Sequence, residues 1–189
     1  MIAALYVQTG GVYFGMAGVD PWDEPRDARM YAGPYPVVAH PPCARWGRYA
    51  TGGPSHPGTQ TFGADGGCFA AALAAVRKWG GVLEHPRDSG AWARYGLPKP
   101  QAGGGWTRSL FGAGWACCID QQHYGHQASK ATWLYFVGPV APPTDLHWGC
   151  PRVGKGKRGR LENLSKRKRS ATPTAFRDLL LSLADRCRP

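Results

Sequence analysis

The sequence contains no Cys-x-x-Cys pair and no uninterrupted apolar run of about 18 residues, the length that crosses a bilayer. The missing run argues against a transmembrane helix, and the amino-terminal MIAALYVQTGG lacks the basic region and cleavage site of a secretion signal. Six irregularly spaced cysteines in a chain of 189 residues favour reduced thiols over a disulfide framework. We therefore expect a cytoplasmic protein that does not associate with membranes.

The missing cysteine pairs also weigh against a bound metal. Cys117 and Cys118 precede His123 and His126, but adjacent cysteines do not have the spacing of a usual zinc site. On a strand, the two thiols would also point to opposite faces. We expect no metal centre.

Acidic residues are scarce, with 12 Asp and Glu against 23 Lys and Arg, and the formal net charge is +11. Residues 152–169 hold nine of the basic residues and one Glu, which leaves a net charge of +3 for the other 171 residues. Such a block most often binds a polyanion, with nucleic acid the first candidate, although a solubilising or disordered segment has the same composition. The basic side chains assigned to nucleic acid are Arg45, Lys155, Lys157, Arg158, Arg160, Lys166, Arg167, Lys168 and Arg169.

A hydrophobic content of 43% and eight tryptophans predict one folded domain with a substantial core. Apolar runs predict strands at residues 2–7, 36–39, 81–86, 115–120 and 132–137. Helices are predicted at 68–80 and near the C-terminus, the latter with Thr172 as N-cap and Pro173 at its first position, whereas 20–36 and 97–114 read mainly as loops. The pattern predicts an α/β domain over 1–150, a basic linker over 151–170, and a helix within 171–189 that packs back on the domain.

Two residues at predicted strand ends are candidates for chemistry. Cys43 follows Pro41-Pro42, and Arg45 nearby could lower the pKa of its thiol, although most isolated cysteines are structural. Glu84 ends an apolar strand and could bind a base edge or transfer a proton; a salt bridge to Arg87 is the alternative. Strand carboxyl ends carry the ligand site in α/β sheets, so both residues could share one crevice.

Taken in order, these stretches resemble the cytosine-C5 DNA methyltransferases. VVAHPPC (37–43) is similar to the strand and Pro-Pro-Cys loop of that family, and the helix at 68–80 leads to GGVLEHP, where the family has a Glu-Asn-Val turn. HYGHQASKATWLYFVG (123–138) follows where the family has a Tyr-Gly segment, a strand with arginines and Val-Gly. LYVQTGGVYFGM resembles the family's glycine-rich first motif, and SATPTAFRDLLLSLA its closing helix.

The resemblance implies a reduced Rossmann-like, methyltransferase-type sheet flanked by helices, in a compact enzyme of phage or prophage type. By this likeness Cys43 would attack C6 of a flipped cytosine, Glu84 would hold the amidine edge of the base, and Lys130 would stand near the base or its phosphate. S-adenosylmethionine would be the methyl donor. Its implied contacts are Gly10, Gly11, Asp20 and Pro41, with Asp23 and Glu24 beside Asp20 as further candidates for its ribose.

DNA is the expected partner, in a bacterial or phage-infected host cell. The short region ahead of residue 37 would leave a sheet edge exposed, so a homodimer or a protein partner is also expected. Two other functions stay open from the residues alone: a non-catalytic DNA-binding relative, and a pyrimidine-C5 modifying enzyme that uses another donor.

Overall fold

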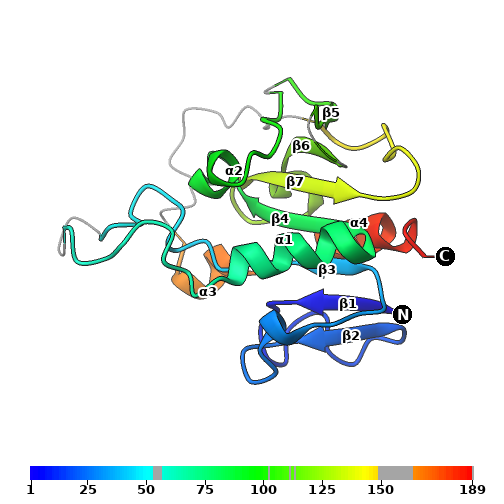
Figure 1. Ribbon diagram of the computed structural model, residues 1–189, viewed down its shortest axis with the longest axis horizontal. Coiled ribbons are helices and arrows are strands. Elements are labelled where there is room, and N and C mark those ends of the chain that lie inside the picture. Colours follow the sequence, from blue (N-terminus) through cyan, green and yellow to red (C-terminus); the bar gives the residue numbers. More distant parts are fainter. Residues whose placement is uncertain (53–56, 102, 111, 113, 149–163, 189) are drawn as a thin grey trace.

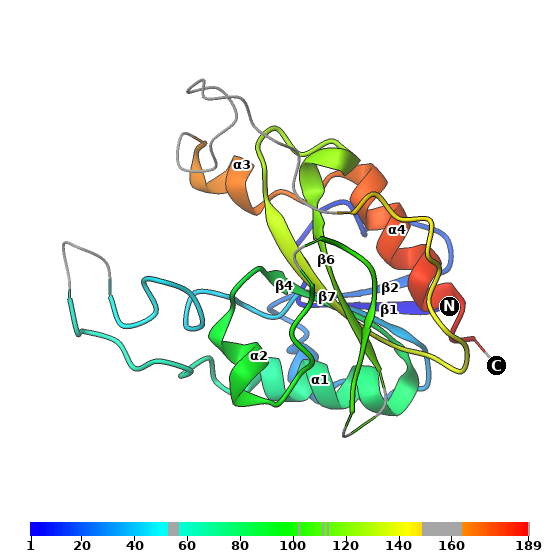
Figure 2. The same ribbon diagram turned by 90° about the horizontal axis from the view of Figure 1, so that it is seen from above.

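A seven-stranded mixed sheet organises the chain, and helices cover both of its faces (Figures 1 and 2). The computed structural model describes residues 1–52, 57–101, 103–110, 112, 114–148 and 164–188. Across the sheet the strands follow the order β2 (Val19–Trp22), β1 (Ile2–Leu5), β3 (Val37–Ala39), β4 (Gly81–Pro86), β7 (Ala131–Val137), β6 (Trp115–Asp120) and β5 (Thr107–Arg108). The first four are mutually parallel, and β7, β6 and β5 continue the sheet in antiparallel pairs.

The central strands are buried on both faces, and their side chains alternate between two cores. In β1, Ala3 and Leu5 join the core beneath α1 (Cys68–Trp79), whereas Ile2 and Ala4 join the core beneath α4 (Thr174–Asp185). Cys117 and Cys118 divide in the same way, which confirms that they point to opposite faces. The short α2 (Gly90–Arg94) lies on the α1 side (Figure 2).

Helix α1 is where the sequence predicts it, because Phe69, Leu73 and Val76 recur on one face and are almost fully buried. Burial of each such side chain contributes about 2 kcal/mol. The helix ends at Gly80, and β4 begins at once with Gly81, whose φ is +121°. A Cβ on Gly81 would overlap the carbonyl oxygen of Val37 in β3, so only glycine allows the two strands to lie this close.

Helix α4 covers the opposite face with Phe176, Leu180 and Leu183. The prediction of its start was wrong by one residue: Pro173, with φ −61° and ψ 147°, is the N-cap in place of Thr172. The fixed φ of proline suits both an N-cap and a first helical position, so the sequence could not separate them.

Two strands lie in segments that were predicted as loops. β2 occupies part of 20–36 and holds Pro21, which an edge strand tolerates because one side of it needs no backbone donor. β5 is only two residues long and lies within 97–114. The remaining elements are η1 (Ala28–Met30), η2 (Gln121–Tyr124) and α3 (Lys166–Ser170).

Candidate functional site

A cavity of about 1400 Å³ opens at the carboxyl ends of the parallel strands. Its walls come from the loop after β1, the segment after β2, the loop after β3, one side of β4, and residues 169–172 ahead of α4. β1 pairs with β2 on one side and with β3 on the other, so the order of the strands reverses between β1 and β3. Ligands of open α/β sheets bind in the crevice at such a reversal, and the cavity occupies that position.

Cys43 lines this cavity and is accessible to solvent. The backbone N–H of His40 donates to the carbonyl of Leu5 (3.0 Å), and the N–H of Trp46 donates to that of Cys43 (3.0 Å), so the loop is tied to β1 and closed by a turn. Pro41, which is buried, also lines the cavity.

The thiol is not activated in the way the sequence suggested. Burial of the loop and the negative charge of Glu84 raise the pKa of Cys43, and Lys130 only partly opposes them. The expectation that Arg45 lowers this pKa was wrong, because Arg45 is not among the groups that act on the thiol and does not line the cavity. Cys43 therefore rests as a thiol.

Glu84 is buried in β4, and both of its carboxylate oxygens are held. Oε2 lies 3.0 Å from Nδ1 of His40, and Oε1 accepts a hydrogen bond of 3.1 Å from Nε2 of Gln121. Gln121 is itself fixed by a second hydrogen bond, to Oγ1 of Thr132 (3.0 Å). Burial raises the pKa of Glu84, but the hydrogen bond from His40 and the charge of Lys130 outweigh it and leave the pKa below its usual range. Glu84 is thus an ionised carboxylate in a fixed orientation.

Lys130 lines the same cavity just ahead of β7. Its backbone N–H donates to Oδ1 of Asp120 (2.9 Å), and its carbonyl accepts from the N–H of Gln121 (3.1 Å), so β6 and η2 position it. Its charge lowers the pKa of both Cys43 and Glu84. The three predicted catalytic residues are therefore brought together from three distant segments.

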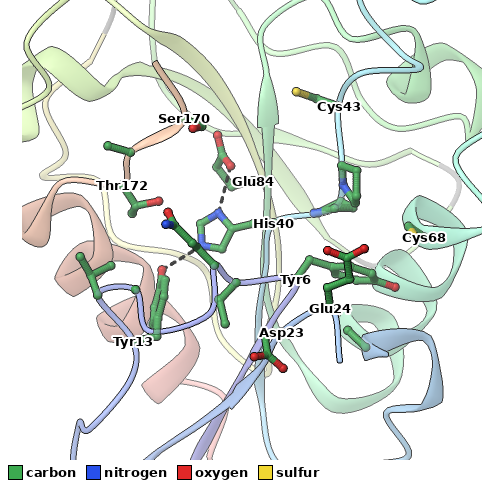
Figure 3. Close-up of a pocket in the computed structure, with 18 of the residues that line it drawn as sticks. Tyr6, Tyr13, Asp23, Glu24, His40, Cys43, Cys68, Glu84, Ser170 and Thr172 are labelled. Carbon is green, nitrogen blue, oxygen red and sulfur yellow. Dashed lines mark hydrogen bonds and ion pairs between the residues drawn. The ribbon is translucent and has the colours of Figure 1, made fainter. Parts of the chain in front are cut away.

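His40, Tyr13 and Gln121 contact the site but are not among the residues predicted for it from the sequence. Nε2 of His40 lies 2.9 Å from the hydroxyl of Tyr13, so Tyr13, His40 and Glu84 form a row (Figure 3). The position of His40 at the carboxyl end of β3, next to the Pro-Pro-Cys loop, was the available signal for it. Nothing in the local sequence distinguishes Tyr13 or Gln121.

His85 lies on β4 next to Glu84 but faces the core. Its Nδ1 is 2.7 Å from Oγ of Ser89, and its ring packs against Phe69 and Trp92. Burial lowers the pKa of His85 to about 4, so the ring is neutral at physiological pH. It supports β4 from within and does not line the cavity.

The other end of the cavity is acidic. Asp23 and Glu24, immediately after β2, line it (Figure 3). Asp23 accepts a hydrogen bond of 2.8 Å from the hydroxyl of Thr9. Gly10 and Gly11 line it as predicted; Gly10 has φ +64°, and a Cβ on Gly11 would lie 2.8 Å from the carbonyl oxygen of Gln8.

Asp20 does not line the cavity and is engaged elsewhere. On β2 it accepts hydrogen bonds from Arg26 (2.6 Å) and from the indole of Trp22 (2.8 Å). Of the three acidic residues named from the sequence, Asp23 and Glu24 are the ones that face a ligand space. Arg177 of α4 donates to the carbonyl of Val12 (2.9 Å) and so fixes the glycine-bearing loop from outside.

The basic residues assigned to nucleic acid divide between described and undescribed parts of the chain. Arg169 lines the cavity, and Lys168 is exposed beside it on α3, to which Lys166 and Arg167 also belong. Lys155, Lys157, Arg158 and Arg160 lie outside the described residues.

Within the described residues, no group of three or more His, Cys, Asp or Glu side chains could hold a metal ion. Cys43, Cys68, Cys117 and Cys187 have free thiols. None of the helices in that part of the chain is both long and apolar enough to cross a membrane. Comparisons with protein-family models, with curated proteins and with solved structures gave no significant match.

Proposed function

We propose that this chain is a DNA-modifying enzyme of the cytosine-C5 methyltransferase kind. The observation that carries the proposal is the meeting of Cys43, Glu84 and Lys130, far apart in the sequence, around one cavity. The glycine-bearing loop after β1 and the carboxylates after β2 line the same cavity. The resemblance in sequence order and the convergence in space are independent of each other, because proximity cannot be read from motif order.

The proposal includes the fold, which we interpret as a reduced Rossmann-like sheet of the methyltransferase type. Its support is the parallel block β2-β1-β3-β4, which reverses between β1 and β3, with helices on both faces. In doubly wound sheets, an acidic residue that follows the second strand accepts hydrogen bonds from a ribose. Asp23 and Glu24 stand at that point, one strand further along than Gly10 and Gly11.

S-adenosylmethionine fits the acidic end of the cavity by its chemistry. Its ribose hydroxyls would find acceptors in Asp23 and Glu24, and its positively charged sulfonium suits a wall that carries carboxylates. Gly10 and Gly11 leave room for close approach to the backbone of the loop. When bound, the donor would supply an electrophilic methyl group.

The residues at the other end suit the addition of a thiolate to a pyrimidine. Cys43, once ionised, would form a bond to C6 of cytosine, and the displaced electron pair would make C5 nucleophilic. Glu84 would accept from the exocyclic amine of the base, since its two oxygens are fixed on the cavity side of β4. Lys130 would stabilise the thiolate and draw in the phosphate or the base.

DNA in which 5-fluorocytosine replaces cytosine tests the proposal without knowledge of a target sequence. Methyl transfer to C5 of such a base leaves a fluorine that cannot depart as a cation, so the bond from Cys43 to C6 should persist. We expect wild-type protein with S-adenosylmethionine to form a covalent protein–DNA complex on denaturing gels, with the adduct at Cys43 by mass spectrometry. Cys43→Ser should form none, whereas Cys68→Ser, which removes the other thiol of the cavity, should form it normally.

The same experiment separates the alternatives. DNA binding without an adduct in any DNA would contradict the proposal and favour a non-catalytic DNA-binding protein. An adduct that forms without S-adenosylmethionine, together with a cytosine product of another mass, would favour a different donor.

A further inference from the structure

Tyr13, His40 and Glu84 form a hydrogen-bonded row along the wall of the cavity (Figure 3). The three side chains come from the loop after β1, the end of β3 and the middle of β4. The row therefore joins the loop at the acidic end of the cavity to the carboxylate at the Cys43 end.

The chemistry of the partners fixes where the imidazole carries its proton. Glu84 is ionised and can only accept, so Nδ1 of His40 must donate to it. A neutral His40 then has a bare Nε2, which accepts from the hydroxyl of Tyr13. A protonated His40 has an N–H at Nε2, which the same hydroxyl accepts after its hydrogen rotates. Burial and the nearby Glu84 raise the pKa of Tyr13, so the phenol keeps its proton in both cases.

The row thus leaves His40 partnered at both ring nitrogens whether it is neutral or charged. Histidine is the side chain that ordinarily changes charge between about pH 5 and 8. An ionised Glu84 has no proton of its own to give to a bound nucleobase. A proton for the substrate must therefore come from another group.

We propose that His40 is the proton-supplying residue of the site, acting on the bound pyrimidine through Glu84. This inference rests on the proposed function and adds a residue to it. As the sulfur of Cys43 bonds to C6, N3 of cytosine takes a proton from the carboxyl of Glu84, which receives the Nδ1 proton of His40. His40 is left neutral with its remaining hydrogen on Nε2, where the hydroxyl of Tyr13 accepts it, and when the thiolate leaves C6 the N3 proton returns by the same route.

The charged and titratable groups around the row are few. Glu84 and, behind it, His85 lie on β4, Cys43 follows on the same loop as His40, and Lys130 precedes β7. Arg177 and Asp178 of α4 act on Tyr13. Among these, His40 is the one whose partners suit both protonation states.

Nuclear magnetic resonance of ¹⁵N-labelled histidine tests the row without any enzymatic activity. We expect the neutral ring of His40 in the free protein, assigned by its loss in His40→Asn, to carry its hydrogen on Nδ1, because Nδ1 faces Glu84. A neutral form with the hydrogen on Nε2 would overturn the inference.

Exchange of tritium from C5 of cytosine in DNA reports the addition step without a methyl donor. Because addition needs Cys43 ionised and His40 protonated, the wild-type rate should rise with pH, reach a maximum and fall at the alkaline end. Asparagine can still donate to Glu84 but cannot carry the proton. His40→Asn should therefore be about a hundredfold slower at neutral pH, and its rate should continue to rise roughly tenfold per pH unit while Cys43 ionises.

Two controls separate this inference from the proposed function. His123→Asn, an exposed histidine that does not line the cavity, should behave as wild type. If His40→Asn exchanges tritium with the wild-type rate and profile, His40 does not supply the proton and the inference is wrong. If wild-type protein neither exchanges tritium nor methylates DNA, the proposed function fails, while the resonance measurement still decides the state of His40.

Discussion

At the scale of single residues, the resting state of Cys43 matters most. A raised pKa keeps the thiol protonated, and a protonated thiol is a poor nucleophile toward oxidants and alkylating agents. Glu84 and Lys130 act on it in opposite directions. The negative charge of Glu84 lowers the reactivity of the Cys43 thiol until a ligand or a proton neutralises that charge.

This balance predicts how the alkylation of Cys43 by iodoacetamide responds to its neighbours. Glu84→Gln removes the charge that raises the pKa and should increase the alkylation rate at pH 7.5 by a factor of about three; Lys130→Met should decrease it by a similar factor. Peptide mass spectrometry measures the rate, with Cys68 as a reference thiol in the same protein. Equal rates in all three proteins would show that neither charge reaches the thiol.

Some of the site could be predicted from residues alone, and the rest could not. Cys43 and Glu84 follow apolar runs, and this pattern marks strand ends and places them at one sheet edge. Their contacts to His40 and Gln121 depend on how β3 and β4 pair and on η2 beyond β6, which no local pattern encodes. The predicted effect of Arg45 on the pKa of Cys43 was wrong, because a residue two positions away in the sequence need not lie close to the thiol in space.

At the scale of elements, the junction of α1 and β4 is the most constrained. Gly81→Ala would place a methyl group against the carbonyl of Val37 and should destabilise the protein by at least about 4 kcal/mol, if it folds at all. Gly96→Ala is a matched control, because Gly96 also has a positive φ but open space around it, and it should cost about 1–2 kcal/mol. Urea unfolding followed by tryptophan fluorescence compares the two. Similar decreases in the free energy of unfolding would mean that β3 and β4 can move apart at little cost in stability.

Elements with strong periodicity or apolar runs were predictable, and the short strands β2 and β5, which have neither, were not. α1, β4, β6 and β7 agree closely with the sequence pattern because each buries several consecutive or evenly spaced apolar side chains. β2 has only four residues, and three of them are Asp20, Pro21 and Trp22, which do not form an apolar run. Its pairing with β1 makes it a strand, and the composition of the segment does not reveal that pairing.

At the scale of the whole molecule, the charge distribution predicts DNA binding that depends steeply on salt. Replacing Lys166, Arg167, Lys168 and Arg169 by serine should reduce the slope of log affinity against log salt by about 3.6 if each side chain contacts one phosphate, since each such contact contributes about 0.9. The control variant removes four positive charges that do not line the cavity, at Arg77, Lys78, Arg94 and Lys99. Fluorescence anisotropy with labelled DNA measures both slopes. A larger effect of the control variant would mean that DNA binds elsewhere.

The position of α4 affects how the protein folds during its synthesis. It is the last element of the chain, yet it covers the face that holds Ile2 and Ala4 of β1, and residues 169–172 just ahead of it form a wall of the cavity. On the ribosome, the strands emerge before the helix that buries one side of them, so a nascent chain exposes an apolar face and is a substrate for chaperones. The cavity is completed only after residues 169–172 have emerged and α4 has packed on the sheet. A chain truncated ahead of residue 169 would have the Cys43 loop but would lack this wall of the cavity.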